Sequence, residues 1–247
     1  MIEAAAASTV SAARPDGCVL SVGSLHAWYG ESHVLYGIDF DVRQGEVVSL
    51  LGRNGAGKTT TLRSLMGMMA RTSGSVMFRG KDIGGRAPEA IARQGMAICP
   101  EERGIFASLS VQENLLLPPV LRPGGMDLDE INGLFPFLKS RLSSQGTKLS
   151  GGEQQMLAIA RILRTGADVI LLDEPTEGLA PVIVEQIGAL ILRLKARGYT
   201  TILVEQNIRF ASSVSDRHLV MENGRIVSEL RGDEAPGDAA LTKYLSV

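Results

Sequence analysis

The sequence has few cysteines: Cys18 and Cys99 are the only two in 247 residues. A disulfide framework needs several cysteines, and a zinc site needs closely spaced ligands, so this pair excludes a disulfide-stabilised secreted fold and a cysteine metal site. We expect two packed thiols in a chain that works in a reducing, cytosolic setting.

Strong charge and long apolar runs are also missing. The formal net charge is -2 with no run of like charge, so the chain lacks the basic surface of a nucleic-acid binder, and we expect no nucleic acid among its partners. No apolar run approaches the roughly 18 residues that span a bilayer. Residues 1–18 lack the basic start and unbroken apolar stretch of a signal peptide, and we predict a disordered leader there.

What the sequence does contain is a repeated strand-and-helix pattern. Three short apolar runs, at residues 46–52, 167–175 and 200–207, are typical of strands buried on both faces. Helical patterns follow the first two, at 58–69 and at about 181–197, where Val182, Ile183, Ile187, Leu190, Ile191 and Leu194 trace one face. This alternation predicts an α/β fold with a parallel core sheet covered by helices.

Other segments depart from that pattern. Residues 20–44 read as short antiparallel strands, and the period-two run at 38–43 indicates a half-exposed sheet. The stretch 101–148 is helical in character, with Ser110 and Glu113 spaced as a capping box, and Asn223-Gly224 predicts a type I′ hairpin. We therefore predict a main domain at 19–235, a helical subdomain inserted at about 102–165, and a tail at 236–247.

A phosphate-binding loop follows the first buried strand and opens a helix. The octapeptide GRNGAGKT matches the pattern G-x-x-x-x-G-K-[ST] in its required context. Its glycines let backbone N–H groups converge on phosphate oxygens, Lys58 reaches the terminal phosphates and Thr59 ligates Mg²⁺. We expect ATP as the ligand, bound by Gly52, Arg53, Asn54, Gly55, Ala56, Gly57, Lys58, Thr59 and Thr60.

Two acids end the second buried strand, and a glycine pair opens a later helix. Asp173 and Glu174 fall at the carboxyl edge of the sheet, where Asp173 can hold Mg²⁺ and Glu174 can polarise an attacking water. The segment LSGGEQQ at 149–155 starts a further helix, as either a second anion-binding helix end or a simple N-cap. One phosphate-binding helix end is already present, so the second suggests a facing second chain.

Together these motifs and their order resemble the nucleotide-binding subunit of ATP-binding cassette (ABC) transporters, over about residues 20–230. The resemblance implies a P-loop NTPase of ABC type with an antiparallel β subdomain and a helical subdomain. It also implies a head-to-tail dimer in which the LSGGE segment touches the partner's ATP through Ser150, Gly151, Gly152 and Glu153. Tyr29 falls where the family stacks an aromatic ring on adenine. The alternative is an ordinary packed or exposed surface tyrosine with no role in binding.

Three departures from the usual family pattern narrow the match. The sequence has Glu101 where a glutamine is common, Ala180 where an aspartate is common, and Gln206 in place of the switch histidine. Together they resemble branched-chain amino acid importer ATPases and the related urea-type importers. The resemblance implies that Glu101 contacts Mg²⁺ or its water. Gln206 follows a parallel strand whose end lies beside Asp173 and Glu174, so we expect it to be catalytic, as a donor to the γ-phosphate or to the attacking water, although it could instead cap the next helix.

The expected function is therefore an ATP-hydrolysing motor subunit of an importer, with ATP and Mg²⁺ bound at the sheet edge. The resemblance implies a homo- or heterodimer of ATPase subunits, two permease subunits and, indirectly, a substrate-binding protein, with this chain peripheral on the cytoplasmic face of the membrane. Alternatives are a urea or short-amide importer, a soluble ABC protein acting on ribosomes or DNA, and a nucleotide-dependent binding module that scarcely hydrolyses ATP.

Overall fold

The computed structural model describes residues 17–232 of the chain. The predicted tail at 236–247 and most of the predicted leader at 1–18 lie outside this range. The predicted leader extends one residue too far, because Cys18 already begins strand β1 and pairs with Arg43 of strand β2.

Two sheets make up the β structure. The larger has six strands in the order β10-β9-β3-β8-β7-β6, and the smaller has four in the order β2-β1-β4-β5. All pairs in the larger sheet are parallel except β10 with β9. The strands are β1 (Cys18–Tyr29), β2 (Ser32–Arg43), β3 (Val47–Leu51), β4 (Arg71–Phe78), β5 (Lys81–Asp82), β6 (Met96–Cys99), β7 (Val169–Asp173), β8 (Thr200–Glu205), β9 (Arg217–Glu222) and β10 (Arg225–Arg231).

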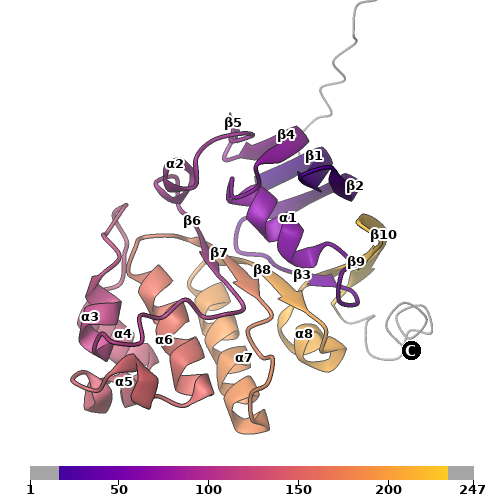
Figure 1. Cartoon of the computed structure of the whole chain (residues 1–247). Helices are drawn as coiled ribbons and strands as arrows, with labels where there is room; N and C mark the ends of the chain where they lie inside the picture. Colours follow the sequence, from indigo (N-terminus) through magenta and orange to yellow (C-terminus); the bar gives the residue numbers. More distant parts are fainter. Residues whose placement is uncertain (1–16, 233–247) are drawn as a thin grey trace, which may run out of the picture.

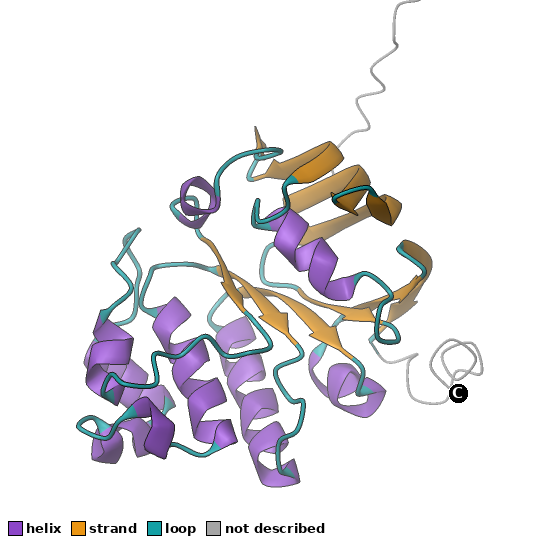
Figure 2. Ribbon diagram, viewed as in Figure 1, coloured by secondary structure: helices purple, strands orange, loops and turns teal. Residues whose placement is uncertain are grey.

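The helices lie mainly on one side of the six-stranded sheet, while α1 and the smaller sheet lie on the other (Figures 1 and 2). Helices α3 to α6 come between β6 and β7 in the chain, where the sequence predicts a helical insertion. The helices are α1 (Lys58–Leu65), α2 (Pro88–Ala92), α3 (Val111–Leu116), α4 (Leu128–Leu134), α5 (Pro136–Arg141), α6 (Gly151–Leu163), α7 (Pro181–Ala196) and α8 (Ile208–Val214), with a 3₁₀ turn at Gly146–Lys148.

The core strands are as buried as their apolar runs predict. Every residue of β3, β7 and β8 is buried. Alternate side chains of β7 face opposite layers: Leu171 packs with α1 and the smaller sheet, whereas Ile170 and Leu172 pack with the helical side. This alternation sends the next side chain, Asp173, toward the α1 side.

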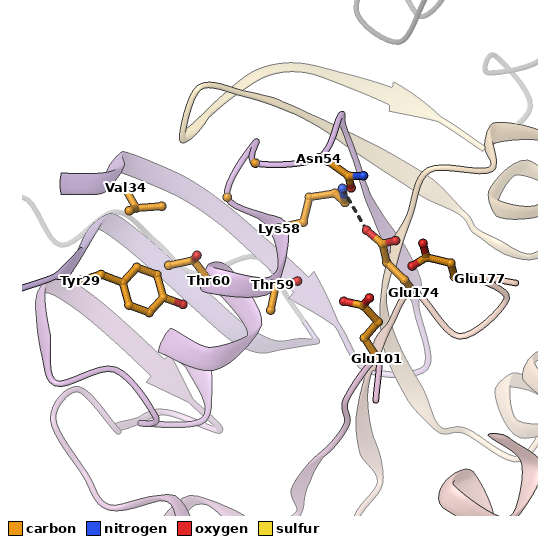
Figure 3. Close-up of a pocket in the computed structure, with 11 residues that line it drawn as sticks. Tyr29, Val34, Asn54, Lys58, Thr59, Thr60, Glu101, Glu174 and Glu177 are labelled. Carbon is orange, nitrogen blue, oxygen red and sulfur yellow. Dashed lines mark ion pairs between the residues drawn. The ribbon is translucent and has the colours of Figure 1, made fainter. Parts of the chain in front are cut away.

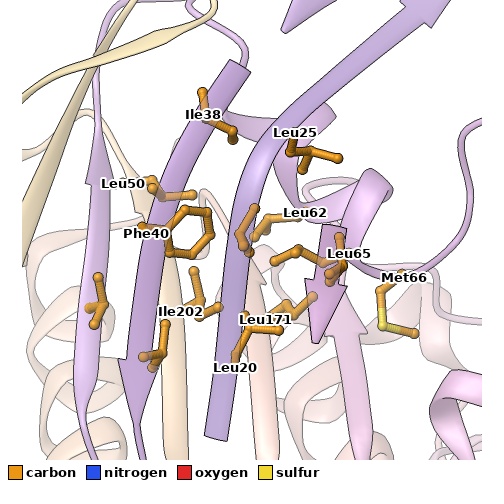
Figure 4. Close-up of a cluster of buried hydrophobic side chains, with 14 of the residues drawn as sticks. Leu20, Leu25, Ile38, Phe40, Leu50, Leu62, Leu65, Met66, Leu171 and Ile202 are labelled. Atoms are coloured by element: carbon orange, nitrogen blue, oxygen red, sulfur yellow. The ribbon is translucent and has the colours of Figure 1, made fainter. Parts of the chain in front are cut away.

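The antiparallel sheet completes the layer above α1. In β2, Ile38, Phe40 and Val42 are buried, as the period-two pattern predicts. Strands β4 and β5 were not predicted from the sequence. Figure 4 shows the resulting core, in which side chains of both sheets meet those of α1 and the turn after it; the labelled residues are Leu20, Leu25, Ile38, Phe40, Leu50, Leu62, Leu65, Met66, Leu171 and Ile202.

Three details differ from the expected helices. Helix α1 ends at Leu65 rather than continuing to residue 69, because Gly67 turns the chain with φ 67° and a Cβ there would lie 2.2 Å from the Arg86 carbonyl oxygen. Val182, predicted on the buried face of α7, is 57% exposed. The helical run at 126–138 splits at Phe135, since the residue before Pro136 is disfavoured in helical geometry.

Local turn and capping predictions are confirmed elsewhere. Ser110 and Glu113 form a capping box at the start of α3. Asn223 and Gly224, between β9 and β10, have φ values of 48° and 72°, the positive values that a type I′ turn requires. Within residues 17–232, no helix has the length and apolar character needed to cross a membrane.

Candidate functional site

The phosphate loop leaves β3 and enters α1 through glycines with left-handed backbone geometry. Gly55 has φ 80°, and Gly57, the N-cap of α1, has φ 106°. Other residues adopt such angles only with strain, and a Cβ on Gly57 would also lie 2.8 Å from the Leu35 side chain. The first N–H groups of α1 have no earlier helical carbonyl to bind, so this helix start favours an anion.

Lys58 is held at the base of the loop. Its side chain is only 4% exposed, and Nζ donates to the carbonyl oxygens of Gly52 at 2.9 Å and Arg53 at 3.2 Å. Nζ also forms an ion pair with Glu174 Oε1 at 3.2 Å. A buried ammonium needs such partners, and they fix one positive charge beside the loop.

Thr59 and Asp173 form a second contact between α1 and the sheet edge. The Thr59 hydroxyl donates to Asp173 Oδ1 at 3.0 Å. Burial raises the pKa of Asp173 to about 6, against the lowering effect of the Thr59 hydrogen bond. A hydroxyl and a carboxylate side by side are ligands that suit Mg²⁺, which commonly keeps waters and substrate phosphates as its remaining ligands.

In its described part, the protein supplies only two of the ligands that Mg²⁺ would need. Within residues 17–232 no group of three histidine, cysteine or acidic side chains is arranged to hold a metal on its own. The Thr59–Asp173 pair instead offers two oxygen ligands at the mouth of the phosphate loop.

Glu174 leaves the end of β7 with an unusual backbone. Its φ is 45°, in the left-handed region that non-glycine residues rarely enter. Such backbone strain clusters at functional sites. Burial raises the pKa of Glu174, but the hydrogen bond from Gln206 and the charge of Lys58 outweigh burial and hold the pKa below its usual value. The carboxylate is therefore charged at neutral pH and can accept a proton.

Lys58, Thr59 and Glu174 line one cavity of about 570 Å³, whereas Asp173 is tied to it only through Thr59. The volume is within the range of small-molecule sites. Figure 3 shows Lys58 and Glu174 pointing toward one another, Glu101 and Glu177 beside Glu174, and Tyr29 with Val34 at the opposite side. The lining residues are Tyr29, Val34, Asn54, Gly55, Gly57, Lys58, Thr59, Thr60, Glu101, Glu174 and Glu177.

Gln206 joins the site from the end of β8. Its side-chain amide donates to Glu174 Oε2 at 2.7 Å and to Asn54 Oδ1 at 2.8 Å. The cap of α8 is the next residue: Asn207 Oδ1 accepts from the Phe210 N–H at 3.1 Å. The alternative in which Gln206 caps that helix is therefore wrong.

Not every predicted residue lines this cavity. Gly52, Asp173 and Gln206 do not line it themselves but bond to Lys58, Thr59 and Glu174, which do. Arg53 and Ala56 line a neighbouring hollow together with Glu222 and Asn223. Ala180 is the N-cap residue of α7 and makes no side-chain cap bond.

The LSGGE segment also lies away from the cavity. Ser150 and Glu153 form a capping box on α6 and line a separate groove beside α7. Ser150, Gly151, Gly152 and Glu153 are all absent from the walls of the cavity that holds Lys58. Within one chain, the two glycine-rich helix starts are not brought together.

Two lining residues were missed from the sequence. Glu177 lies in the turn after Glu174; a hydrogen bond with Glu174 and their mutual repulsion raise its pKa. An acid three residues after Glu174, in the turn that leaves the sheet edge, could have been predicted from the sequence to lie at the site. Val34 reaches the cavity because the β1–β2 hairpin places it near Tyr29, and no sequence pattern marks that register.

Comparison with known protein families gives a match. The family model described as "ABC transporter" matches residues 35–177, more than half of the chain. The chain is 41% identical to the high-affinity branched-chain amino acid transport ATP-binding protein BraG of Pseudomonas aeruginosa, over 85% of this chain and 91% of that protein. It is 35% identical to the probable branched-chain amino acid transport ATP-binding protein LivF of Archaeoglobus fulgidus, over 84% and 90%.

Solved structures agree with these matches. A crystal structure of a nucleotide-free ATP-binding cassette from an ABC transporter superposes with a TM-score of 0.80 at 26% identity, covering 92% of this chain and 98% of that one. With the phosphate loop, the paired acids and the LSGGE helix in the expected order, the chain belongs to the ABC transporter family, as an ATP-binding cassette.

Proposed function

We propose that this chain is the ATP-hydrolysing subunit of an importer for branched-chain amino acids. The observation that carries the proposal is that Lys58, Thr59 and Glu174 line one cavity at the carboxyl ends of β3 and β7, with Asp173 bonded to Thr59 behind it. An ammonium, an anion-binding helix start and a charged carboxylate are what phosphoryl transfer to water requires.

The chain's own residues have distinct roles in this proposal. Lys58 and the N–H groups of the phosphate loop bind the β- and γ-phosphates. Glu174 orients a water and takes its proton as the water oxygen bonds to phosphorus and the bond to the leaving ADP oxygen breaks. Gln206 holds that carboxylate through one amide N–H. Its second N–H, which bonds Asn54 of the phosphate loop in this structure, would turn to the developing charge.

Mg²⁺ and the base of ATP would occupy the two sides of the cavity. Thr59 and Asp173 would hold Mg²⁺, with Glu101 near its water ligands, and the ion would neutralise charge on the phosphates. Tyr29, which is 46% exposed, would stack on adenine. A solved relative at 26% identity, described as the ADP conformation of an ATP-binding cassette, supports an adenine nucleotide as the ligand.

A second ATPase subunit completes the site in this proposal. Ser150, Gly151, Gly152 and Glu153 start α6 away from their own chain's cavity, so they are free to meet ATP bound by a facing chain. The dimer is head-to-tail and is formed either by two copies of this chain or with a related subunit.

The proposed cargo and membrane partners rest on similarity to named relatives. BraG and LivF are named for branched-chain amino acid transport, and the chain covers about nine-tenths of each. We infer two permease subunits that dock on the helical subdomain, a substrate-binding protein that meets the permease, and a peripheral position on the cytoplasmic face of the membrane. Urea or short amides remain the alternative cargo.

Two measurements test the proposal. Mg²⁺-dependent release of phosphate from ATP by the purified chain distinguishes a motor from a module that only binds nucleotide. Isolation of the native complex, with identification of its permease and binding protein, tests the cargo. Recovery of ribosomal or DNA-repair partners instead would overturn the transport role.

A further inference from the structure

Glu205 is a buried carboxylate that the proposed chemistry does not use. It is the last residue of β8, only 3% exposed, and it does not line the cavity. Burial raises the pKa of Glu205, and three hydrogen bonds to the carboxylate oppose that shift. A buried acid is costly, so its three donors are the clue to its role.

The donors come from two different loops. The Thr176 hydroxyl, in the turn after β7, donates to Glu205 Oε1 at 2.6 Å. The backbone N–H groups of Gln206 and Asn207 donate to Oε2 at 3.2 and 3.3 Å. Glu205 therefore fixes the chain where it leaves β8 and ties it to the turn that carries Glu174 and Glu177.

A second tie lies next to it. The Glu174 N–H donates to the Val204 carbonyl oxygen at 3.0 Å, so the two segments are joined at Glu174 itself and again two residues later at Thr176. Between these ties the Gln206 amide meets Glu174 Oε2 at 2.7 Å. Gln206 directly follows Glu205, and Glu174 lies two residues before Thr176, so the Thr176–Glu205 and Gln206–Glu174 hydrogen bonds join the same two loops.

We propose that Glu205 is a positioning residue for hydrolysis: through Thr176 and the backbone of Gln206, it sets the Gln206 amide against Glu174. The inference rests on the proposed function, in which Gln206 and Glu174 act together on ATP. Glu205 itself does not line the cavity.

The chemistry of each substitution follows from the donors. Glu205→Gln can keep the network, because its carbonyl oxygen accepts from the two N–H groups and its amide donates to the Thr176 hydroxyl. Glu205→Leu removes every acceptor and leaves buried donors without partners. Thr176→Val removes one donor and keeps the side-chain shape, so it loosens the tie with less risk to folding, while Thr176→Ser keeps the hydroxyl.

The test is ATP turnover and ATP affinity of the full-length chain. We expect Thr176→Val and Glu205→Leu to lower kcat roughly tenfold to a hundredfold, with a dissociation constant for ATP within about threefold of wild type. Glu205→Gln and Thr176→Ser should restore most of the rate. Thr201→Val is the matched control for Thr176→Val. Thr201 is buried on β8, the strand of Glu205, and its hydroxyl has no hydrogen-bond partner within the described residues.

A double variant separates positioning from general loss of structure. If Glu205 acts through Gln206, Thr176→Val should cost little further rate once Gln206→Ala is present. Wild-type kcat in Thr176→Val, or multiplied losses in the double variant, would overturn the proposal. Wild-type kcat in Gln206→Ala would overturn it as well. Failure of the proposed function would show elsewhere, as no Mg²⁺-dependent release of phosphate from ATP by the wild-type chain.

Discussion

Gln206 and Glu174, which are 32 residues apart in the chain, are joined by a side-chain hydrogen bond of 2.7 Å. They directly follow the neighbouring parallel strands β8 and β7, so the sheet delivers both to the same edge. A glutamine amide can donate to a carboxylate as a histidine N–H does, but it does not titrate near neutral pH. The contact therefore orients Glu174 without adding a proton of its own.

Gln206→Ala should separate hydrolysis from binding. Loss of one donor near the developing charge lowers turnover on the order of 10–10³-fold. ATP affinity should change little, because Lys58 and the phosphate loop are untouched. Steady-state turnover and nucleotide titration measure the two quantities, and a wild-type rate would mean that Gln206 has no part in the reaction.

The neighbouring residue offers a control for Gln206. Asn207 caps α8, so Asn207→Ala should lower the free energy of unfolding by roughly 1 kcal/mol. The Asn207 side chain accepts from the Phe210 N–H of α8, and its substitution leaves the backbone N–H in place, so turnover should stay near wild type. If Asn207→Ala lost as much turnover as Gln206→Ala, both losses would be due to disruption of the start of α8 and not to the Gln206 side chain.

Lys58→Ala should abolish both ATP binding and turnover. Lys58 is the buried cation at the phosphate loop, and its loss also leaves Glu174 without its ion-pair partner. Equilibrium titration with a fluorescent ATP analogue measures the binding. Lys81→Ala, on exposed strand β5, removes a charge of the same kind and should bind normally. Unchanged affinity in Lys58→Ala would move the phosphate site elsewhere.

Much of this site could be predicted because it is local in sequence. The phosphate loop, its lysine and the acids that end a buried strand each combine a spacing with a strand or helix boundary. Glu205 and Thr176 could not be paired in advance, since their contact depends on the register of β7 against β8. The predicted end of α1 was wrong because Gly67, with its left-handed φ of 67°, stops the helix early, and the nearby Arg86 carbonyl leaves no room for a side chain there.

Glu174→Gln should bind ATP and hydrolyse it slowly. The amide keeps the size of the side chain but cannot accept the proton of the attacking water, and loss of a general base costs roughly 10²–10⁴-fold in rate. With hydrolysis blocked, we expect an ATP-bound dimer to accumulate, which size-exclusion chromatography with light scattering would detect. Glu89→Gln, an exposed acid on α2, serves as the control. Wild-type turnover in Glu174→Gln would assign the base to another residue.

The last prediction concerns stability rather than catalysis, and it centres on His218. This residue of β9 is fully buried; its Nδ1 faces the Ser49 hydroxyl and its Nε2 faces the Gly232 carbonyl oxygen. Burial lowers the pKa of His218, and the weak bond to Gly232 only partly opposes this.

Because the folded pKa of His218 lies below the unfolded value of about 6.5, the unfolded chain takes up a proton first as the pH falls. The stability that His218 contributes is thus complete above that pH and is lost as the pH drops toward the folded pKa. For one proton the slope cannot exceed about 1.4 kcal/mol per pH unit. Urea unfolding of wild type and His218→Gln between neutral pH and pH 5 measures it, and other titrating groups cancel in the difference. We expect the variant to lose less stability on acidification; equal slopes would mean that His218 accepts its proton without cost in the fold.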